Sequence, residues 1–344
     1  MWSRAVSSTS VLRCLLGRLL GGHAEALCPR VYLAPELLAP SDVDAIPRGV
    51  VAQALNIVLL ARSMSEVPDL ARYTDEKLAS SAGPIVLDHG AVRSVRHVET
   101  GELPPGQLAF SRFLVPLGYE EADAYPLPGL RMLGHGWRHR DHPEQVAQYF
   151  ISELNVDAFS PAFQATTERV VMSSVDPLSK ASEASLAVLS ETGVIGLDAA
   201  VGLVTNLTAC FARHHAPPSL ADYDILLRES AEMAWIATEG HTFNHATDRV
   251  ADVDDVAERQ RRLGRRIKAT VEVSTAGTVR QTAFEAVTVW RPFRDSEGGV
   301  VQRPVPGSFF EMISRDPHPD GGGLDLRFDA SNAQGIFAMT RGQE

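Results

Sequence analysis

Apolar residues recur at helical spacing in the first quarter of the chain. Leucines stand at positions 12, 15, 16, 19 and 20. Over residues 47–80 the apolar positions again share one helix face, and Pro68 starts or interrupts a further turn. The residues on that face are Val50, Val51, Leu55, Val58 and Leu59. The pattern predicts that residues 1–82 form a helical region packed on a core.

The pattern changes at Gly83-Pro84, two residues that break regular structure. They are followed by the short apolar run Ile85-Val86-Leu87 and then by the polar residues Asp88 and His89. A short apolar run bounded by breakers is typical of a buried strand. We therefore expect a strand that delivers Asp88 and His89 to a site at its end.

Helical signals dominate from Pro143 to about residue 237. Pro143 suits the first turn of a helix, a segment from Ser182 is closed by Gly193, and a long apolar helix runs from residue 197 towards 211. Ser219 then has the character of an N-cap for residues 220–236. The sequence predicts a helical insertion at about residues 143–240.

The last third of the chain favours strands. Residues 270–273, 279–290 and 308–314 are rich in β-branched and aromatic side chains. An acid-then-base run over residues 254–262 has the character of a solvated helix face and is assigned no function. With sheet at both ends and helices between, the predicted fold class is α+β, with a second region over residues 83–344.

Composition excludes several partners. The chain has 344 residues and a net charge of −11, which would repel nucleic acid and anionic membranes alike. No stretch approaches the ~20 consecutive apolar residues of a membrane span. The three cysteines, at positions 14, 28 and 210, are scattered, which argues against a disulfide framework or a thiolate metal site. We expect a soluble protein of the cytoplasm; the sequence does not indicate its oligomeric state.

The first 27 residues permit a second interpretation. They contain Arg4, Arg13 and Arg18, several serines and no acid before Glu25, which is the composition of an organelle transit peptide. The same segment also fits an ordinary first helix. Organelle targeting therefore stays open beside the cytoplasmic prediction.

Candidate chemistry begins with His89 and Arg93. A neutral imidazole is a good ligand for iron or zinc, and a guanidinium four residues further on could clamp a carboxylate in the same pocket. A metal beside an arginine suits an anionic substrate. By itself, however, a histidine at the end of a strand is more often structural than a ligand.

A second candidate is the string Glu239-Gly-His241-Thr242-Phe-Asn-His245-Ala-Thr. Two histidines four residues apart would share a helix face, as in zinc proteases, but those enzymes require glutamate where Thr242 stands. If one histidine binds metal, its neighbours could orient it through hydrogen bonds. The choice between His241 and His245 is open at this point, and so is a turn without metal.

The third candidate is Glu311, which stands between bulky apolar residues in the expected strand 308–314. Burying a carboxylate is costly unless it is paired or binds a cation. Arg315 could pair with it instead, and Glu285 and Glu239 are alternative carboxylates. Outward exposure of Glu311 is equally compatible with this segment.

One further histidine cluster is left out of the site. Residues 134–142 hold three histidines and two arginines, and we expect them to form a polar loop that caps the helix near Pro143. The chain contains no G-x-S-x-G elbow, Walker loop or G-x-G-x-x-G fingerprint. The sequence therefore has none of the motifs that usually indicate a hydrolase of that type or a nucleotide-binding enzyme.

Taken together and in order, the motifs resemble the 2-oxoadipate dioxygenase/decarboxylase family over roughly residues 50–340. The blocks that carry the resemblance are His89-Gly-Ala-Val-Arg93, Phe243-Asn-His245-Ala-Thr247, residues 279–284, Phe310-Glu311 with Arg315, and Ser331-Asn332-Ala-Gln-Gly-Ile-Phe337. The family is similar in fold to vicinal-oxygen-chelate enzymes, whose open, curved β-sheet forms a cup around one metal.

The resemblance implies a site as well as a fold. It places the metal ligands at His89, His245 and Glu311, the substrate-carboxylate arginine at Arg93, and further substrate contacts at Ser331 and Asn332. Two histidines and one carboxylate are the ligand set of non-haem iron(II) oxygenases. The cofactor implied is Fe²⁺, with a 2-oxo acid and dioxygen as small-molecule partners.

The implied reaction converts a 2-oxo acid, 2-oxoadipate first, to a 2-hydroxy acid one carbon shorter, 2-hydroxyglutarate, with dioxygen uptake and carbon dioxide release. Two other classes stay open, because fold alone does not decide function. One is a redox-neutral metal-dependent lyase or isomerase of the same fold. The other is a non-catalytic relative that binds a small molecule.

Overall fold

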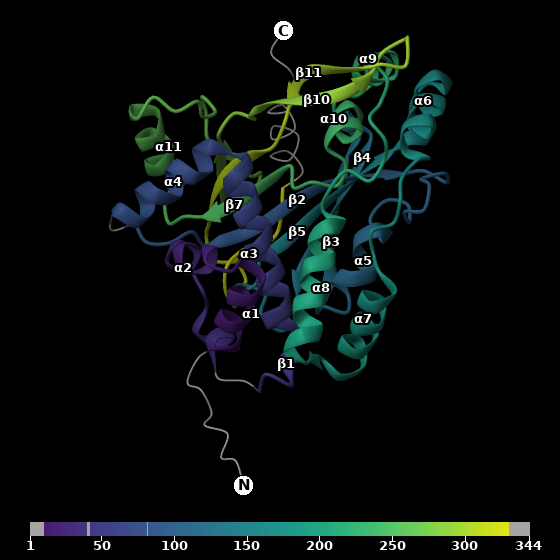
Figure 1. Ribbon diagram of the computed structural model, residues 1–344. Coiled ribbons are helices and arrows are strands. Elements are labelled where there is room, and N and C mark those ends of the chain that lie inside the picture. The colour runs from purple at the N-terminus through teal and green to yellow at the C-terminus, as the bar shows by residue number, and fades with distance from the viewer. Residues whose placement is uncertain (1–9, 40–41, 81, 330–344) are drawn as a thin grey trace.

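A computed structural model describes residues 10–39, 42–80 and 82–329 (Figure 1). Its centre is an eight-stranded sheet in the order β3-β4-β5-β2-β7-β12-β9-β8. The pairs β2–β5 and β7–β12 are parallel, and the other neighbours are antiparallel. The strands of this sheet are β2 (Leu87–Arg96), β3 (Tyr119–Leu127), β4 (Met132–His139), β5 (Gln148–Asn155), β7 (His245–Arg249), β8 (Glu272–Val273), β9 (Val279–Ala283) and β12 (Phe309–Arg315).

Two short antiparallel pairs lie outside this sheet. β1 (Ile46–Pro47) pairs with β6 (Val194–Ile195), and β10 (Thr288–Arg294) pairs with β11 (Val300–Pro306) as a ribbon. Figure 1 shows the ribbon at the top of the molecule, opposite the N-terminal helices at the bottom.

α-Helices pack against the sheet. Their bounds are α1 (Val11–Leu20), α2 (His23–Leu27), α3 (Arg48–Glu66), α4 (Pro68–Ala79), α5 (Leu108–Leu114), α6 (Pro161–Val171), α7 (Lys180–Thr192), α8 (Leu197–Cys210), α9 (Leu220–Glu229), α10 (Ala231–Glu239) and α11 (Val253–Arg262). Among the described residues, no single helix is long and apolar enough to cross a membrane; α3 and α4 pass that test only as a pair bent by 112°. Most of α3 is buried in the core.

Several helix ends are fixed by the residues that the sequence pattern singled out. Gly193 closes α7 with a positive φ of 73°, a conformation that favours glycine. The Ser219 side chain accepts a hydrogen bond from the Asp222 N–H and caps α9. The expected helix over residues 220–236 is divided, however, because Ser230 is extended and its hydroxyl caps a new helix, α10.

Two expectations about residues 134–155 are wrong. Pro143 starts no helix, and the chain enters strand β5 at Gln148. The histidine-rich residues 134–142 are not a capping loop, since most of them form β4. Both strands are buried on both faces, so they lack the alternation that reveals a strand, and the apolar run in β5 is equally compatible with a helix.

The other strand predictions are confirmed with shifted bounds. β2 runs ten residues from Leu87, so His89 lies near its beginning rather than beyond its end. The expected strand 279–290 is two strands, β9 and β10, and the expected solvated helix is α11, capped by Asp252. The α+β class is confirmed, whereas the division into regions 1–82 and 83–344 stays a prediction.

The pleat of the sheet decides which residues share a face. Successive strand residues point to opposite sides, so His89, Ala91 and Arg93 of β2 lie on one face. Val92, on the other face, packs in the larger apolar core with helix α3. A second apolar core, which includes Trp235 of α10, packs beyond Arg93. One face of the sheet therefore packs against α3, and the opposite face holds the polar residues next to the core that includes α10.

Candidate metal centre

Three side chains from three adjacent strands meet on the polar face of the sheet. His89 comes from β2, His245 from β7 and Glu311 from β12. One ligand atom from each residue lies within 4.8 Å of the others, and all three residues are buried. The Nε2 atoms of His89 and His245 lie 3.3 Å and 3.4 Å from Oε2 of Glu311. Far-apart segments of the chain thus converge on one point.

Strand register produces this convergence. Thr247 of β7 is the Cα partner of both His89 and Glu311, so these three residues form one row across three strands. His245 is two residues before Thr247, on the same face, in the next row. The Thr247 hydroxyl donates to Glu311 Oε2 at 2.8 Å and lies 3.1 Å from His89 Nε2. A one-residue slip in any of these strands would disperse the group.

Burial and neighbouring charges set the ionisation of the three residues. Burial lowers the pKa of His245 to about 3, so its imidazole is neutral. Burial opposes ionisation of Glu311, but hydrogen bonds with His89 and Thr247 and the charge of His89 lower its pKa. Burial also opposes protonation of His89, but hydrogen bonds to Asp88 and Glu311 outweigh it and raise its pKa.

The donor set fits a divalent metal ion. Nδ1 of His245 and Oε1 of Glu311 are buried and have no hydrogen-bond partner among the described residues. A buried carboxylate without full pairing is costly, and a cation bound between the three side chains would remove that cost. Two imidazoles and one carboxylate are the ligands of the facial-triad iron(II) oxygenases, which keep open coordination positions. The residues present therefore suit Fe²⁺.

The alternative ligands lie elsewhere. Glu239 is bonded through both oxygens to Arg291 at 2.7 and 2.8 Å, and Glu285 pairs with Arg266 at 3.3 Å. Arg315 does not pair with Glu311; it bonds the carboxylate of Asp88.

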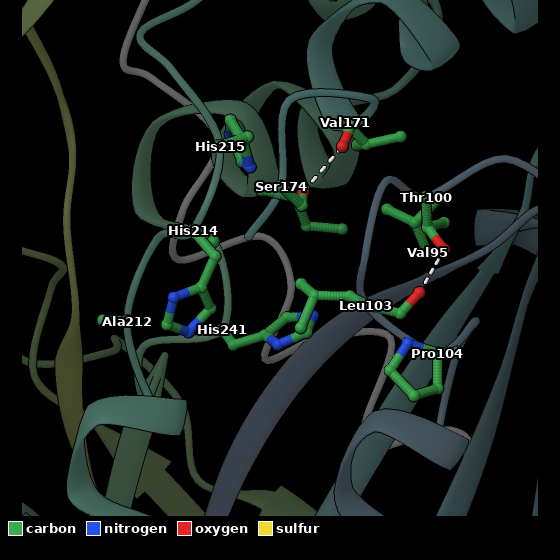
Figure 2. A pocket seen from close by; sticks show the side chains of 13 residues that line it. Val95, Thr100, Leu103, Pro104, Val171, Ser174, Ala212, His214, His215 and His241 are labelled. Carbon is green, nitrogen blue, oxygen red and sulfur yellow. Dashed lines mark hydrogen bonds between the residues drawn. The ribbon is translucent and has the colours of Figure 1, made fainter. Parts of the chain in front are cut away.

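His241 lines a different pocket of about 380 Å³ (Figure 2). Figure 2 shows its ring beside His214, with His215 above them. Burial lowers the pKa of His241 to about 3. Among the described residues, these three histidines do not form a metal-ligand group. Of the two histidines that the sequence left open, the geometry therefore joins His245 to the candidate ligands.

Arg93 lies on the same face of β2 as His89, four residues further on. It is fully buried, and its guanidinium carbon lies 4.8 Å from the centre of the Trp235 ring. Ala91 is the Cα partner of His245, and Arg93 follows Ala91 by two residues on the same face, so Arg93 lies in the next row of the sheet. Its Cα partner on β5 is Ser152, which lines the cavity beside the ligands.

The cavity at the three ligands has a volume of about 430 Å³ and is partly open to solvent. Its lining residues are His89, Ala91, Phe150, Ser152, Asn244, His245, Gln281, Glu311, Phe328 and Asp329. Phe328 packs edge-on against His89 and contacts Phe150, with ring centroids 4.9 and 4.8 Å apart. The expected substrate contacts Ser331 and Asn332 lie outside the described residues.

Sequence reasoning missed the aromatic wall of this cavity. Gly134 and Gly136 are two residues apart in β4, so both face the cavity. A Cβ on Gly134 would lie 2.4 Å from the Phe150 ring. A Cβ on Gly136 would lie 3.2 Å from Phe328. Alternating glycines in a strand signal a close approach by another group. The two glycines are therefore the sequence signal for this wall, and they lie in the segment that was expected to be a loop and forms β4.

Comparison with known proteins decides the family. The model of the 2-oxoadipate dioxygenase/decarboxylase family matches residues 50–317, which include all three candidate ligands and Arg93. This chain belongs to that family. Two curated relatives with the same name, from Mycobacterium bovis and Mycobacterium tuberculosis, are 28% identical over 280 residues, or 78% of this chain. The chain spans only 62% of the length of these relatives.

Solved structures support the fold expected for the 2-oxoadipate dioxygenase/decarboxylase family. A glyoxalase superfamily protein from Ralstonia eutropha JMP134 is 45% identical, with a TM-score of 0.88 over 93% of this chain and 98% of that one. Hydroxyglutarate synthase from Oryza sativa, solved in complex with 2-oxoadipate, is 20% identical, with a TM-score of 0.65 over 88% and 96%. The expected α+β fold with a vicinal-oxygen-chelate-like curved sheet is confirmed.

Proposed function

We propose that this protein is an iron(II)-dependent dioxygenase and decarboxylase of 2-oxo acids, with 2-oxoadipate as the first candidate substrate. Fe²⁺ would be held by His89, His245 and Glu311. The observation that carries the proposal is this buried group of two imidazoles and one incompletely paired carboxylate, beside a buried arginine. Family membership and the 2-oxoadipate complex of the Oryza sativa relative support the same substrate class.

The proposed reaction consumes one dioxygen and releases one carbon dioxide for each 2-oxo acid. The bond between the carboxylate carbon and the keto carbon breaks. One oxygen atom enters the new carboxylate, and the other enters a hydroxyl on the adjacent carbon. The substrate supplies all four electrons, so 2-oxoadipate gives 2-hydroxyglutarate without a further reductant. Bound iron would supply the activation of dioxygen, which no protein side chain provides.

The role of Arg93 follows from its charge and burial. A guanidinium presents a fixed fork of N–H donors that matches a carboxylate, and a dry environment strengthens this contact. A 2-oxo acid that reaches the ligands would place a carboxylate within range of the same face of β2. We assign Arg93 to binding and orienting the substrate, with Ser152 and Asn244 as neighbouring polar contacts.

The remaining wall of the cavity would exclude water. Phe150 and Phe328 line one side of it, and the Phe309 ring packs against His245 with centroids 4.8 Å apart. Asn244 is buried, and its Oδ1 has no partner among the described residues, so it can accept a hydrogen bond from a ligand. An apolar wall with a few fixed polar groups is the usual construction of a small-molecule site.

The test is dioxygen uptake by the iron-loaded protein with a panel of 2-oxo acids, 2-oxoadipate first. Uptake should match carbon dioxide release one to one, and ¹⁸O₂ should place one label in the carboxylate and one in the hydroxyl of the product. Turnover without dioxygen would instead support a redox-neutral lyase or isomerase. Tight binding of the acid without turnover would support a non-catalytic role.

Metal content tests the ligands separately. After anaerobic loading, His89→Ala and His245→Ala should each lose iron, while His241→Ala, the matched variant in the neighbouring pocket, should keep it. Undiminished iron in both ligand variants would overturn the ligand assignment whatever the activity.

The cytoplasmic location remains a prediction drawn from cysteine usage.

A further inference from the structure

Asp88 and His89 are consecutive in the chain, yet their side chains meet. Asp88 Oδ1 lies 2.8 Å from His89 Nδ1. In a regular strand, neighbouring side chains point to opposite faces. Here the register between β2 and β7 shifts between Leu87 and His89, and such a bulge turns a side chain out of the regular alternation. The local backbone therefore brings a carboxylate onto the ring nitrogen of His89 that faces away from Glu311.

Arg315, the last residue of β12, holds that carboxylate in place. Its Nε and Nη2 donate to the two oxygens of Asp88 at 3.0 and 2.9 Å. Both side chains are essentially inaccessible to solvent, with 0% and 1% exposure. A buried, bidentate ion pair of this kind fixes the orientation of the Asp88 carboxylate more effectively than an exposed ion pair would.

The same guanidinium also binds the chain that walls the cavity. Nη1 of Arg315 donates to the backbone oxygens of Asp325 and Arg327, each at 2.8 Å. Residues 324–329, which we call the wall segment, then continue to Phe328, whose ring packs against His89. The Phe328 N–H donates to the Tyr125 hydroxyl at 3.1 Å. One arginine thus contacts both the partner of a candidate ligand and the segment over that ligand.

We infer that Asp88 and Arg315 are positioning residues that couple metal binding at His89 to the seating of the wall segment. Asp88 fixes the orientation of the His89 ring, so that Nε2 faces Glu311 and His245. Arg315 transmits this order to residues 324–329 and so to the aromatic wall of the substrate cavity. Metal binding stabilises the wall segment, and a seated wall segment tightens metal binding by the same factor. The inference rests on the ligand assignment made above.

The first experiment measures metal affinity by anaerobic equilibrium dialysis with Fe²⁺ and with Co²⁺. Asp88→Asn keeps the shape but removes the charge, and we expect affinity to fall about 10- to 100-fold, the usual effect of losing a partner of a ligating histidine. Arg280→Lys is the matched control for the second variant, Arg315→Lys, because Arg280 of β9 pairs with Asp316, the residue after β12, and not with Asp88. The Arg280→Lys variant should bind Fe²⁺ and Co²⁺ with the affinity of the parent.

The second experiment measures coupling through limited proteolysis of the full chain. In the parent, Co²⁺ should slow cleavage within residues 316–329, and in Arg315→Lys this protection should be lost, since a lysine cannot bond Asp88 and two carbonyls together. The KM for the 2-oxo acid should rise in the same variant. Equal protection by Co²⁺ in the parent and in Arg315→Lys would overturn the coupling.

A measurement on the unaltered protein covers the case in which the variants fail to fold. In the Co²⁺-loaded parent, the Nδ1 proton of His89 should give a hyperfine-shifted NMR signal that exchanges slowly with solvent, because it is buried against Asp88. Absence of any slowly exchanging imidazole signal would overturn the role of Asp88. If His89→Ala instead keeps its metal, the ligand assignment itself has failed, so the two failures are distinguishable.

Discussion

At the scale of single residues, Arg93 is the clearest test of substrate binding. It is fully buried on the ligand face of β2. Arg93→Met keeps much of the side-chain volume and removes the charge. Because hydrogen bonds to charged groups are worth about 1.5–3 kcal/mol, we expect binding of the acid to weaken roughly 10- to 150-fold. Steady-state kinetics and direct binding of 2-oxoadipate would measure this loss.

Two controls separate substrate binding from general damage. The iron content of Arg93→Met should equal that of the parent, since no candidate ligand is removed. Arg96→Met changes an exposed arginine at the end of the same strand and should leave substrate affinity unchanged. Parent-like affinity in Arg93→Met would remove Arg93 from the site.

The candidate residues differed in how far the sequence alone could place them. His89 and Arg93 were placed together by their spacing and the strand before them. His241 and His245 could not be separated, because spacing does not state which side of a strand or turn a residue occupies. The row formed by His89, Thr247 and Glu311 across three strands decides between them, because His245 lies two residues before Thr247 on the same face. That row depends on strand register, which the sequence does not state.

At the scale of elements, β4 controls the shape of the cavity through its glycines. In Gly134→Ala, the new Cβ would lie 2.4 Å from the Phe150 ring, so the ring must move. Overpacking of this kind costs about 1–3 kcal/mol. We expect a corresponding loss in the free energy of unfolding, measured by urea denaturation, and a lower kcat/KM because Phe150 lines the cavity.

Gly202→Ala is the matched control on helix α8. No atom lies within 4 Å of a Cβ at that position, and the residue is exposed. Replacing glycine by alanine inside a helix stabilises by roughly 0.5–1 kcal/mol. The two substitutions should therefore change stability in opposite directions; destabilisation by Gly202→Ala as large as that by Gly134→Ala would contradict the steric explanation.

Element prediction succeeded where local signals agree and failed where burial removes them. Gly193 and Ser219 mark helix ends through their own backbone and side-chain chemistry, so α7 and α9 could be anticipated. β4 and β5 are covered on both faces, so their sequences lack the alternation of a half-exposed strand. His135 of β4 belongs to an ion-pair cluster with Glu121 and Glu153, which is formed by tertiary contacts alone.

That cluster joins three strands and bears on the stability of the whole molecule. His135 of β4 lies with Nδ1 2.6 Å from Glu121 Oε1 on β3, and with Nε2 2.9 Å from Glu153 Oε2 on β5. Burial opposes protonation of His135, but hydrogen bonds to Glu153 and Glu121 outweigh it and raise its pKa above 6.5. Burial likewise opposes ionisation of Glu153, but the His135 bond lowers its pKa below 4.5.

These two shifts define a pH window. A raised histidine pKa contributes stability that is complete below 6.5, the usual histidine value, and is lost as the pH rises through the folded value. A lowered carboxyl pKa contributes stability that is complete above 4.5 and is lost as the pH falls through the folded value. The cluster should therefore stabilise the fold most between these two values.

We predict that His135→Gln loses about 1.5–3 kcal/mol of unfolding free energy inside this window, the worth of its charged hydrogen bond to buried Glu153. The difference in unfolding free energy between His135→Gln and the parent should shrink at pH values below and above this window. His215→Gln is a control with the opposite pH dependence, because burial lowers the pKa of His215 to about 4. Buried His215 therefore destabilises the parent as the pH falls below 6.5, and the variant lacks this effect. Urea unfolding of the parent and both variants across pH would measure these profiles. A pH-independent difference for His135→Gln would mean that His135 acts by packing alone, and the charged link between β3, β4 and β5 would be excluded.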